Sequence, residues 1–267
     1  MNQQDPIRMV NVDDLPWEPH VMGSSIRKVL DTDPSVDSYV HYRFAPPGGA
    51  AAKVRRLHLS ISETFFFLGG SFNSWEFDSP EDVEGDVVRF RDGTFMDRVP
   101  YSVHGTGPDL GTPTGATFLM WTSGGGEFEA DTQESIQIPF AGSMPRFNEP
   151  YTKPTVIDTT SLAWEDHPSR AGWQWRPISL ETAVTPRPVS EIFIPPAWQG
   201  SAQSVPARTR AFLFVRAGEL AAQIDDRTVS LKEGTYLRWG PGTAIRLVSS
   251  SPIGARVLCV GHDLSAM

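Results

Sequence analysis

Two histidines and one glutamate are spaced as metal ligands on neighbouring strands would be. His58 and Glu63 flank a short predicted turn at residues 59–62, and His104 follows a later strand. Alternate side chains of an extended strand share a face, so a turn that folds back would aim His58 and Glu63 into one cavity. Two imidazoles and a carboxylate can hold Fe(II), which we favour, or zinc or manganese, with positions open for substrate and oxygen.

An arginine shares the strand face of the first histidine. Arg56 lies two residues before His58 and so points to the same side of the strand. Its guanidinium can bind a substrate carboxylate or enolate through two parallel hydrogen bonds. The same positive charge repels a metal cation and lowers its affinity. A metal-free barrel that binds an anion through Arg56 and Arg43 therefore stays open as an alternative.

Further side chains are candidates for contact with a substrate. His41 and Arg43 share one face of the preceding strand and could act as an acid, a base or an anion clamp. In a lyase or isomerase the metal would polarise a carbonyl, and His41 or Tyr101 would move protons. The side chains expected to shape the cavity around a small, partly apolar substrate are Phe65, Phe67, Tyr101 and Trp121.

The elements that must position these residues have the patterns of strands. The chain has 23 glycines and 23 prolines, which favours many short elements separated by turns. No helix longer than two turns is expected. Regularly spaced short strands are typical of an all-β sandwich or barrel. The β-prone runs lie at residues 39–44, 63–68, 72–77, 87–90 and 116–122.

The chain also repeats itself. Residues 10–20 and 155–167 both contain an aspartate followed by Leu-x-Trp-Glu-x-His. Residues 93–100 align without gaps with residues 234–241. Matched segments at a fixed order along the chain indicate copies of one structural unit.

A third matched pair fixes the number of copies at two. Residues 65–68 and 212–215 are aromatic and aliphatic runs, and each precedes a glycine turn. Three matched segments in the same order are hard to obtain by chance. We therefore expect two domains, at residues 1–145 and 146–267.

The second copy lacks the ligand set. The alignment places Ile245 opposite His104, and Arg210 falls close to the position of Glu63. This half is expected to be structural or to form a dimer interface. Its inward positions are expected to carry Phe212, Phe214 and Trp239.

The first motif resembles that of the cupin superfamily. The usual form is Gly-x5-His-x-His-x3–4-Glu-x6-Gly, and this chain reads Arg56-x-His58-x4-Glu63-x6-Gly70. The second histidine, the glutamate and the glycine match the family spacing. Arg56 replaces the first histidine, so one of the family's usual ligands is missing.

The second motif narrows the resemblance. The family form ends Pro-x-Gly-x2-His, and here it is Pro100-x-Ser102-x-His104, one residue shorter. This form, together with the Leu-Pro-Trp at residues 15–17, resembles the ChrR-type cupins. That group includes an anti-sigma-factor zinc cupin and dihydroxyacetophenone dioxygenase.

The resemblance implies both a fold and a reaction. The fold would be two tandem cupin barrels, each a double-stranded β-helix or jelly roll, with metal held only in the first by His58, Glu63 and His104. The reaction would be O2-dependent C–C cleavage of a diketone or hydroxyaryl ketone, with Arg56 offsetting enolate charge. The alternatives are a metal-dependent lyase or isomerase, and a non-catalytic binding or sensing barrel, although no helical partner-binding segment supports sensing.

Composition limits the partners. The formal net charge of −9 argues against nucleic acid or an anionic membrane, since both require basic patches. The single cysteine excludes an internal disulfide. No signal peptide or membrane-spanning run is evident, so a cytoplasmic protein with a small-molecule substrate is expected. Exposed barrel sheets favour a homodimer.

Overall fold

The structure is a computed structural model of the 267-residue chain. Apart from two short 3-10 helices, η1 (Val12–Asp14) and η2 (Thr159–Ser161), its elements are strands. This confirms the all-β prediction. The residues it describes are 7–20, 25–33, 38–49, 53–58, 62–123, 135–140, 142, 151–167, 171–179, 188–200, 203–204, 211–224, 226–240, 243–249 and 251–261. For His58 and a few other strand-end residues, this description covers the backbone and leaves out the side chain.

The chain forms two compact units. Residues 16–160 make up one unit, called the first barrel below. Residues 1–15 and 161–267 make up the other, called the second barrel. The number of units agrees with the predicted duplication, but the boundaries differ from the halves expected from the repeat.

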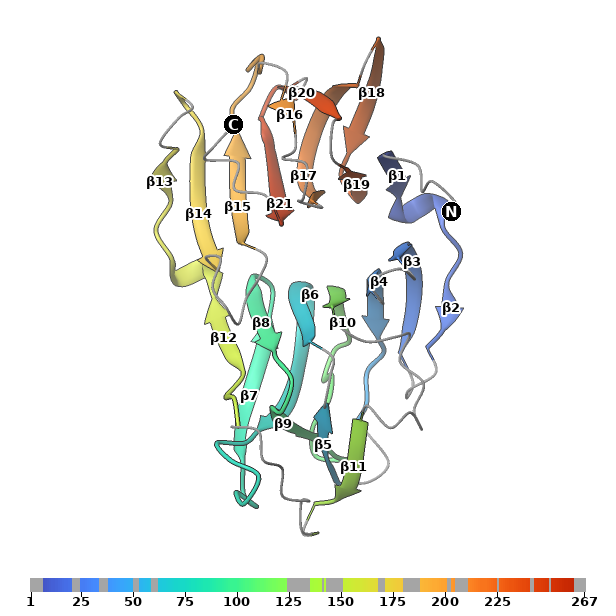
Figure 1. Ribbon diagram of the computed structural model, residues 1–267, viewed down its shortest axis with the longest axis vertical. Helices are drawn as coiled ribbons and strands as arrows, with labels where there is room; N and C mark the ends of the chain where they lie inside the picture. The colour runs from blue at the N-terminus through green and yellow to red at the C-terminus, as the bar shows by residue number, and fades with distance from the viewer. Residues whose placement is uncertain are drawn as a thin grey trace. The chain divides into compact units, whose positions relative to one another are not determined.

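Two exchanged strands explain the difference in boundaries. β1 (Ile7–Asn11) pairs antiparallel with β19 (Thr235–Trp239) of the second barrel. β12 (Thr155–Asp158) pairs antiparallel with β8 (Thr94–Arg98) of the first barrel. Figure 1 shows β1 beside β19 and β12 beside β8. Each copy therefore receives its outer strand from the segment that precedes the other copy.

Two of the repeated sequence segments contact each other in both barrels. The amide of Val12 donates a hydrogen bond of 3.0 Å to the carbonyl of Gly234. The amide of Thr159 donates one of 2.9 Å to the carbonyl of Gly93. Both glycines have positive φ, which only glycine adopts without strain. The two segments therefore recur together because they form one contact.

The first barrel is built on one antiparallel sheet. Within the described residues its strands run in the order β11-β5-β9-β6-β10-β4-β3-β2, with β7 paired to β6 and β8 paired to both β6 and β12. The remaining strands are β2 (Glu18–Pro19), β3 (Ile26–Asp33), β4 (Ser38–Ala45), β5 (Val54–His58), β6 (Ser62–Glu76), β7 (Asp86–Arg91), β9 (Val103–Thr106), β10 (Ala116–Ser123) and β11 (Ser135–Pro139).

The long strand β6 runs through the middle of this sheet. The sequence predicted separate strands at residues 63–68 and 72–77, but β6 continues without interruption from Ser62 to Glu76. It bends at Gly70, whose φ is 73° and where a Cβ would collide with the carbonyl oxygen of Gly115. The early part of β6 pairs with β8 and β10, and the late part pairs with β7 and β9.

The second barrel repeats this arrangement. Its long strand β17 pairs with β18, β19, β20 and β21, and it bends near Gly218, which also has positive φ. The remaining strands are β13 (Glu165–Asp166), β14 (Gln174–Ser179), β15 (Val189–Ile194), β16 (Gln203–Ser204), β17 (Ala211–Ile224), β18 (Arg227–Lys232), β20 (Ala244–Ser249) and β21 (Ala255–Val260).

The described elements include no candidate membrane-spanning helix. Among the described residues, no helix has the length and apolar character needed to cross a bilayer. The homodimer expected from the exposed sheets stays a prediction, because a single chain does not test it.

Candidate ligand-binding site in the first barrel

The inner face of the first barrel has an apolar part. Phe65 and Phe67 of β6 lie there and both pack against Phe118 of β10, while their contact with a substrate stays a prediction. The buried residues of this cluster are Tyr39, Ala45, Phe65, Phe67, Phe90, Met96, Ala116, Phe118 and Met120. Polar side chains border it on the same face.

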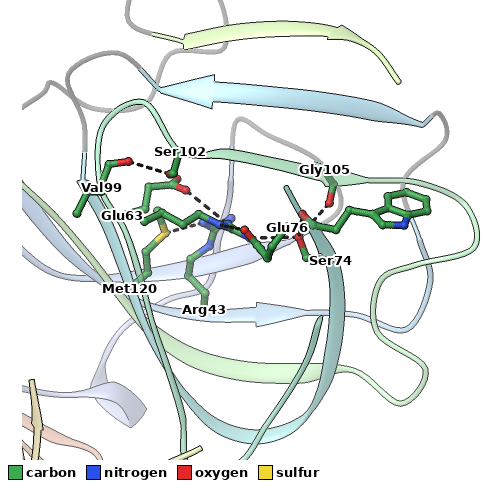
Figure 2. A network of polar contacts seen from close by, with 10 residues as sticks. Arg43, Glu63, Ser74, Glu76, Val99, Ser102, Gly105 and Met120 are labelled. Atoms are coloured by element: carbon green, nitrogen blue, oxygen red, sulfur yellow. Dashed lines mark hydrogen bonds and ion pairs between the residues drawn. The ribbon is translucent and has the colours of Figure 1, made fainter. Parts of the chain in front are cut away.

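The most connected of these polar side chains is Arg98, on β8. Its Nη2 lies 2.5 Å from Glu76 Oε1 and 3.1 Å from Ser74 Oγ, and its Nη1 lies 3.7 Å from Glu63 Oε2. Arg98, Glu63 and Glu76 are all buried. The bend of β6 brings Glu63, at the start of the strand, and Glu76, at its end, to the same guanidinium. Figure 2 shows Glu63, Ser74 and Glu76 within this network.

A second arginine lies beside this network. Arg43 of β4 is 8% exposed, and its Nη1 contacts the sulfur of Met120 at 2.9 Å (Figure 2). Its Nη2 donates a hydrogen bond of 2.6 Å to Ser25 Oγ. Burial lowers the pKa of Arg43 to about 10, and the nearby carboxylate of Glu63 opposes that shift. Arg43 therefore remains a cation at neutral pH.

The third arginine and a histidine share the same face. Arg56 of β5 lies directly opposite His104 of β9, and His104 lies opposite Glu76 of β6. Side chains of directly opposed residues are neighbours on one face of a sheet. Arg56 reaches outward as well, because its Nη2 donates a 2.6 Å hydrogen bond to Gln137 Oε1, an exposed contact. Burial lowers the pKa of Arg56, and Glu63 opposes this.

The charges of this cluster do not balance. Arg43, Arg56 and Arg98 all interact electrostatically with Glu63, and Arg98 also pairs with Glu76. Among the described residues, three guanidinium groups thus surround two carboxylates. An uncompensated charge in a barrel interior is costly, so this arrangement favours an anionic partner.

The second barrel shows that the fold does not require these polar residues. Glu63 faces Arg98 across β6 and β8, whereas Ala211 faces Trp239 across β17 and β19. The matching strand registers extend to most of the cluster, where the counterparts belong to one apolar core, although Arg56 corresponds to the polar Gln203. The pairs are Arg43 and Ile192, Glu63 and Ala211, Ser74 and Ala222, Glu76 and Ile224, Arg98 and Trp239, and His104 and Ile245.

For the long strands β6 and β17, the alignment based on strand register is shifted by one residue from the alignment based on sequence. Phe212 and Phe214 were expected to point into the barrel, but Leu213 and Val215 belong to its apolar core, while Phe212 and Phe214 are buried on the other face of the strand, where Phe212 packs against Tyr236. The prediction for Trp239 is correct. Because side chains alternate, a slip of one residue moves every side chain to the other face. For the same reason Ala211, and not Arg210, is the counterpart of Glu63.

Two predicted cavity residues lie elsewhere. Tyr101 packs against a cluster that includes Leu57 and Val103. Leu57 is adjacent to Arg56 on β5 and Val103 is adjacent to His104 on β9, so both point to the other face of the sheet. Trp121 alternates with Met120 on β10 and contacts Phe95 at a ring-centroid distance of 6.5 Å. Both aromatic rings are therefore on the opposite face of the sheet from the polar cluster.

The expected hairpin between β5 and β6 is absent from the described part of the sheet. β5 pairs with β9 and β11, and no described residue of β5 pairs with β6. The backbone of His58 ends β5 and pairs with Ser135, while its side chain lies outside the described residues. The predicted ligand set of His58, Glu63 and His104 therefore stays a prediction.

The described residues by themselves do not fit a metal ion. In this part of the chain, no group of three His, Cys, Asp or Glu side chains converges closely enough to hold one. Glu63 already has a cationic neighbour in Arg98. A metal bound by Glu63 would have to displace that guanidinium or lie beside it, against charge repulsion.

His41 occupies an unusual position on the same wall. It is fully buried, two residues before Arg43 on β4, and its ring stacks on Tyr39 with centroids 4.2 Å apart. Burial, with the charges of Arg27 and Arg43 and a contribution from His20, lowers the pKa of His41 to about 2. A group with so low a pKa is a weak base at neutral pH, so the predicted proton-transfer role is disfavoured.

The sequence analysis missed Arg98, Ser74 and Glu76. A signal for Arg98 was present, because the gapless alignment of residues 93–100 with 234–241 places it opposite Trp239. Aligning the bends at Gly70 and Gly218 would have found the other two. Where one copy of a duplicated chain has an ionisable residue and the other copy has an apolar residue at the matching position, the fold does not require the ionisable residue.

Comparison with solved structures places this architecture among known proteins. The protein Ylba from E. coli matches with a TM-score of 0.64 and 9% identity, over 97% of this chain and 92% of that one. An oxalate decarboxylase variant from Bacillus subtilis matches with a TM-score of 0.65 and 12% identity, over 96% of this chain and 77% of that one. The chain has the cupin fold. At this level of identity, the likeness extends to the fold alone.

Sequence comparison adds no closer relative to these cupin-fold structures. No family model matches the chain, and no curated protein matches its sequence. For this chain with a cupin fold, the polar cluster is therefore the feature that indicates a function.

Proposed function

We propose that the first barrel binds a small organic carboxylate in its interior. The observation that carries this proposal is that, among the described residues of this cluster, arginines outnumber carboxylates, while the second barrel has apolar residues at most of the matching positions. Arg43 is the residue best placed to hold the ligand, because one of its partners is a thioether, which is a weak acceptor. A carboxylate would replace that contact with two charge-assisted hydrogen bonds.

The aromatic neighbours support an organic ligand over a simple inorganic anion. The guanidinium carbon of Arg43 lies 5.5 Å from the ring centroid of Phe118, and that of Arg98 lies 5.5 Å from the centroid of Phe65. These rings offer apolar surface beside the cations. A ligand with a carboxylate and a short carbon chain matches both kinds of surface.

Calorimetric titration with propionate tests this proposal. We expect saturable binding by the wild type, and a loss of affinity of about 30-fold to 5,000-fold in Arg43→Met, the range for losing one partner of a buried charge pair. Arg91→Met is the matched control, since Arg91 is exposed and pairs with Asp158. Equal affinities in wild type and Arg43→Met, or no binding of any short carboxylate, would contradict the proposal.

A metal-dependent enzyme acting on such a molecule is the second candidate. The observation that favours it is that His104 and Glu63 both lie on this polar inner face, where their counterparts are Ile245 and Ala211. With His58 they would complete the predicted ligand set for Fe(II), zinc or manganese. With such a site the protein could be an Fe(II) dioxygenase that cleaves a diketone or hydroxyaryl ketone, or a metal-dependent lyase or isomerase.

Elemental analysis of protein purified without chelators decides whether metal is bound. For the second candidate we expect near-stoichiometric iron, zinc or manganese in the wild type and its loss in His58→Ala and His104→Ala. His167→Ala in the second barrel is the control and should retain the metal. Iron with oxygen uptake on diketones would support the dioxygenase. If the wild type contains no metal and still binds carboxylates, the metal-dependent enzyme is ruled out and carboxylate binding stands.

A further inference from the structure

The two ring nitrogens of His41 are the least satisfied polar atoms of the first-barrel wall. His41 is 0% exposed, and within the described part of the chain neither Nδ1 nor Nε2 has a hydrogen-bond partner. Buried polar atoms almost always have one, because burying such a group without a partner is costly. Such a group in a native protein calls for an explanation.

Arg43 has a similar unsatisfied atom on the same strand face. Its Nε is buried and has no hydrogen-bond partner among the described residues. His41 and Arg43 alternate on β4, and Met120, which contacts Arg43, is the direct register partner of His41 on β10. The unsatisfied atoms of both side chains therefore lie on one wall, beside the polar cluster.

The chemistry of these atoms restricts what could satisfy them. Arg43 offers only N–H donors and requires an acceptor, which a carboxylate supplies. A neutral imidazole offers one donor and one lone pair, so its best single partner is a hydroxyl, which both accepts and donates. Alternate residues on a strand are roughly 7 Å apart, a gap that a few heavy atoms span with a hydrogen bond at each end.

We propose that the ligand of the first barrel is a 2-hydroxy carboxylate whose carboxylate binds Arg43 and whose hydroxyl binds His41. This inference rests on the proposed carboxylate-binding function and names the substrate class of the same site. The second barrel agrees with it, because its counterparts of His41 and Arg43 are Ser190 and Ile192 and so lack both groups.

The charged surroundings keep His41 in the form that this contact requires. Burial first, and then the charges of Arg27 on β3, Arg43 on β4 and His20, lower the pKa of the ring, on which Tyr39 stacks. The imidazole therefore stays neutral across the physiological range. Recognition of the hydroxyl should not change between pH 5 and pH 8, whereas a histidine with an ordinary pKa would titrate within that window.

A pair of matched ligands tests the inference. Lactate and propionate differ in the 2-hydroxyl group, and both are titrated by calorimetry into wild type, His41→Phe and Arg43→Met. We expect the wild type to bind lactate about tenfold more tightly than propionate at both pH 5 and pH 8. In His41→Phe the ratio should fall to about one while the propionate affinity stays within about threefold, because phenylalanine keeps the stack on Tyr39.

The outcomes separate the two proposals. If the wild type binds both acids equally, or if His41→Phe keeps the preference, the hydroxyl inference is wrong while carboxylate binding stands. If neither acid binds, both proposals fail together. Circular dichroism checks that His41→Phe is folded. His41→Gln is a second variant, which should keep part of the preference because its amide can both donate and accept.

Discussion

Replacing Arg98 with methionine is expected to lower the free energy of unfolding by about 3–5 kcal/mol, the usual range for removing one partner of a buried ion pair. The reason is that Glu63 and Glu76 would both remain buried without the guanidinium that lies between them. Burial already raises the pKa of Glu76, and Arg98 opposes that effect. Urea denaturation of the wild type and Arg98→Met measures the difference.

The second barrel supplies the matched control for this variant. In the triple variant Glu63→Ala, Glu76→Ile and Arg98→Trp, the cluster receives the residues of its own apolar counterpart. We expect its stability to lie within about 2 kcal/mol of the wild type, since replacing a whole buried ion network by apolar groups is often neutral. It should also lose propionate binding. A triple variant as unstable as Arg98→Met would mean that the network is structural.

Replacing Glu191 with leucine is expected to destabilise the second barrel by about 3–5 kcal/mol. Glu191 is 1% exposed and accepts contacts from three arginines: Arg176 at 3.1 Å, Arg256 at 3.3 Å and Arg216. Without the carboxylate, these cations would repel one another around an apolar side chain. Chemical denaturation of Glu191→Leu measures the loss, and the matched control is the exposed pair of Glu219 and Ser230, where Glu219→Leu should change stability by less than about 0.5 kcal/mol.

Salt gives an independent readout for the same variant. Added sulfate should restore part of the stability of Glu191→Leu, because the anion can neutralise the exposed side of the arginine cluster, where Arg256 is 43% exposed. The control Glu219→Leu should show no such specific gain. A loss below about 1 kcal/mol in Glu191→Leu would show that the three arginines find other compensation.

The sequence alone determined the all-β class, the duplication and several inward positions. Phe65 and Phe67 were recognisable as residues of one strand face because side chains alternate along a strand. The comparison of His104 with Ile245 was also correct, since the segment after the Gly93 turn has no insertion relative to its copy. These features depend on local geometry, which a sequence pattern records directly.

Tertiary structure decided which side chains meet. The bend in β6 brings Glu63 and Glu76 to Arg98, and no local pattern links three residues on different parts of a sheet. The exchanged strands β1 and β12 moved the domain boundaries, because pairing across the chain depends on long-range hydrogen bonds. The ligand set of His58, Glu63 and His104 stays a prediction, and the folded chain adds a neighbour that no local pattern indicated, because Glu63 lies beside Arg98.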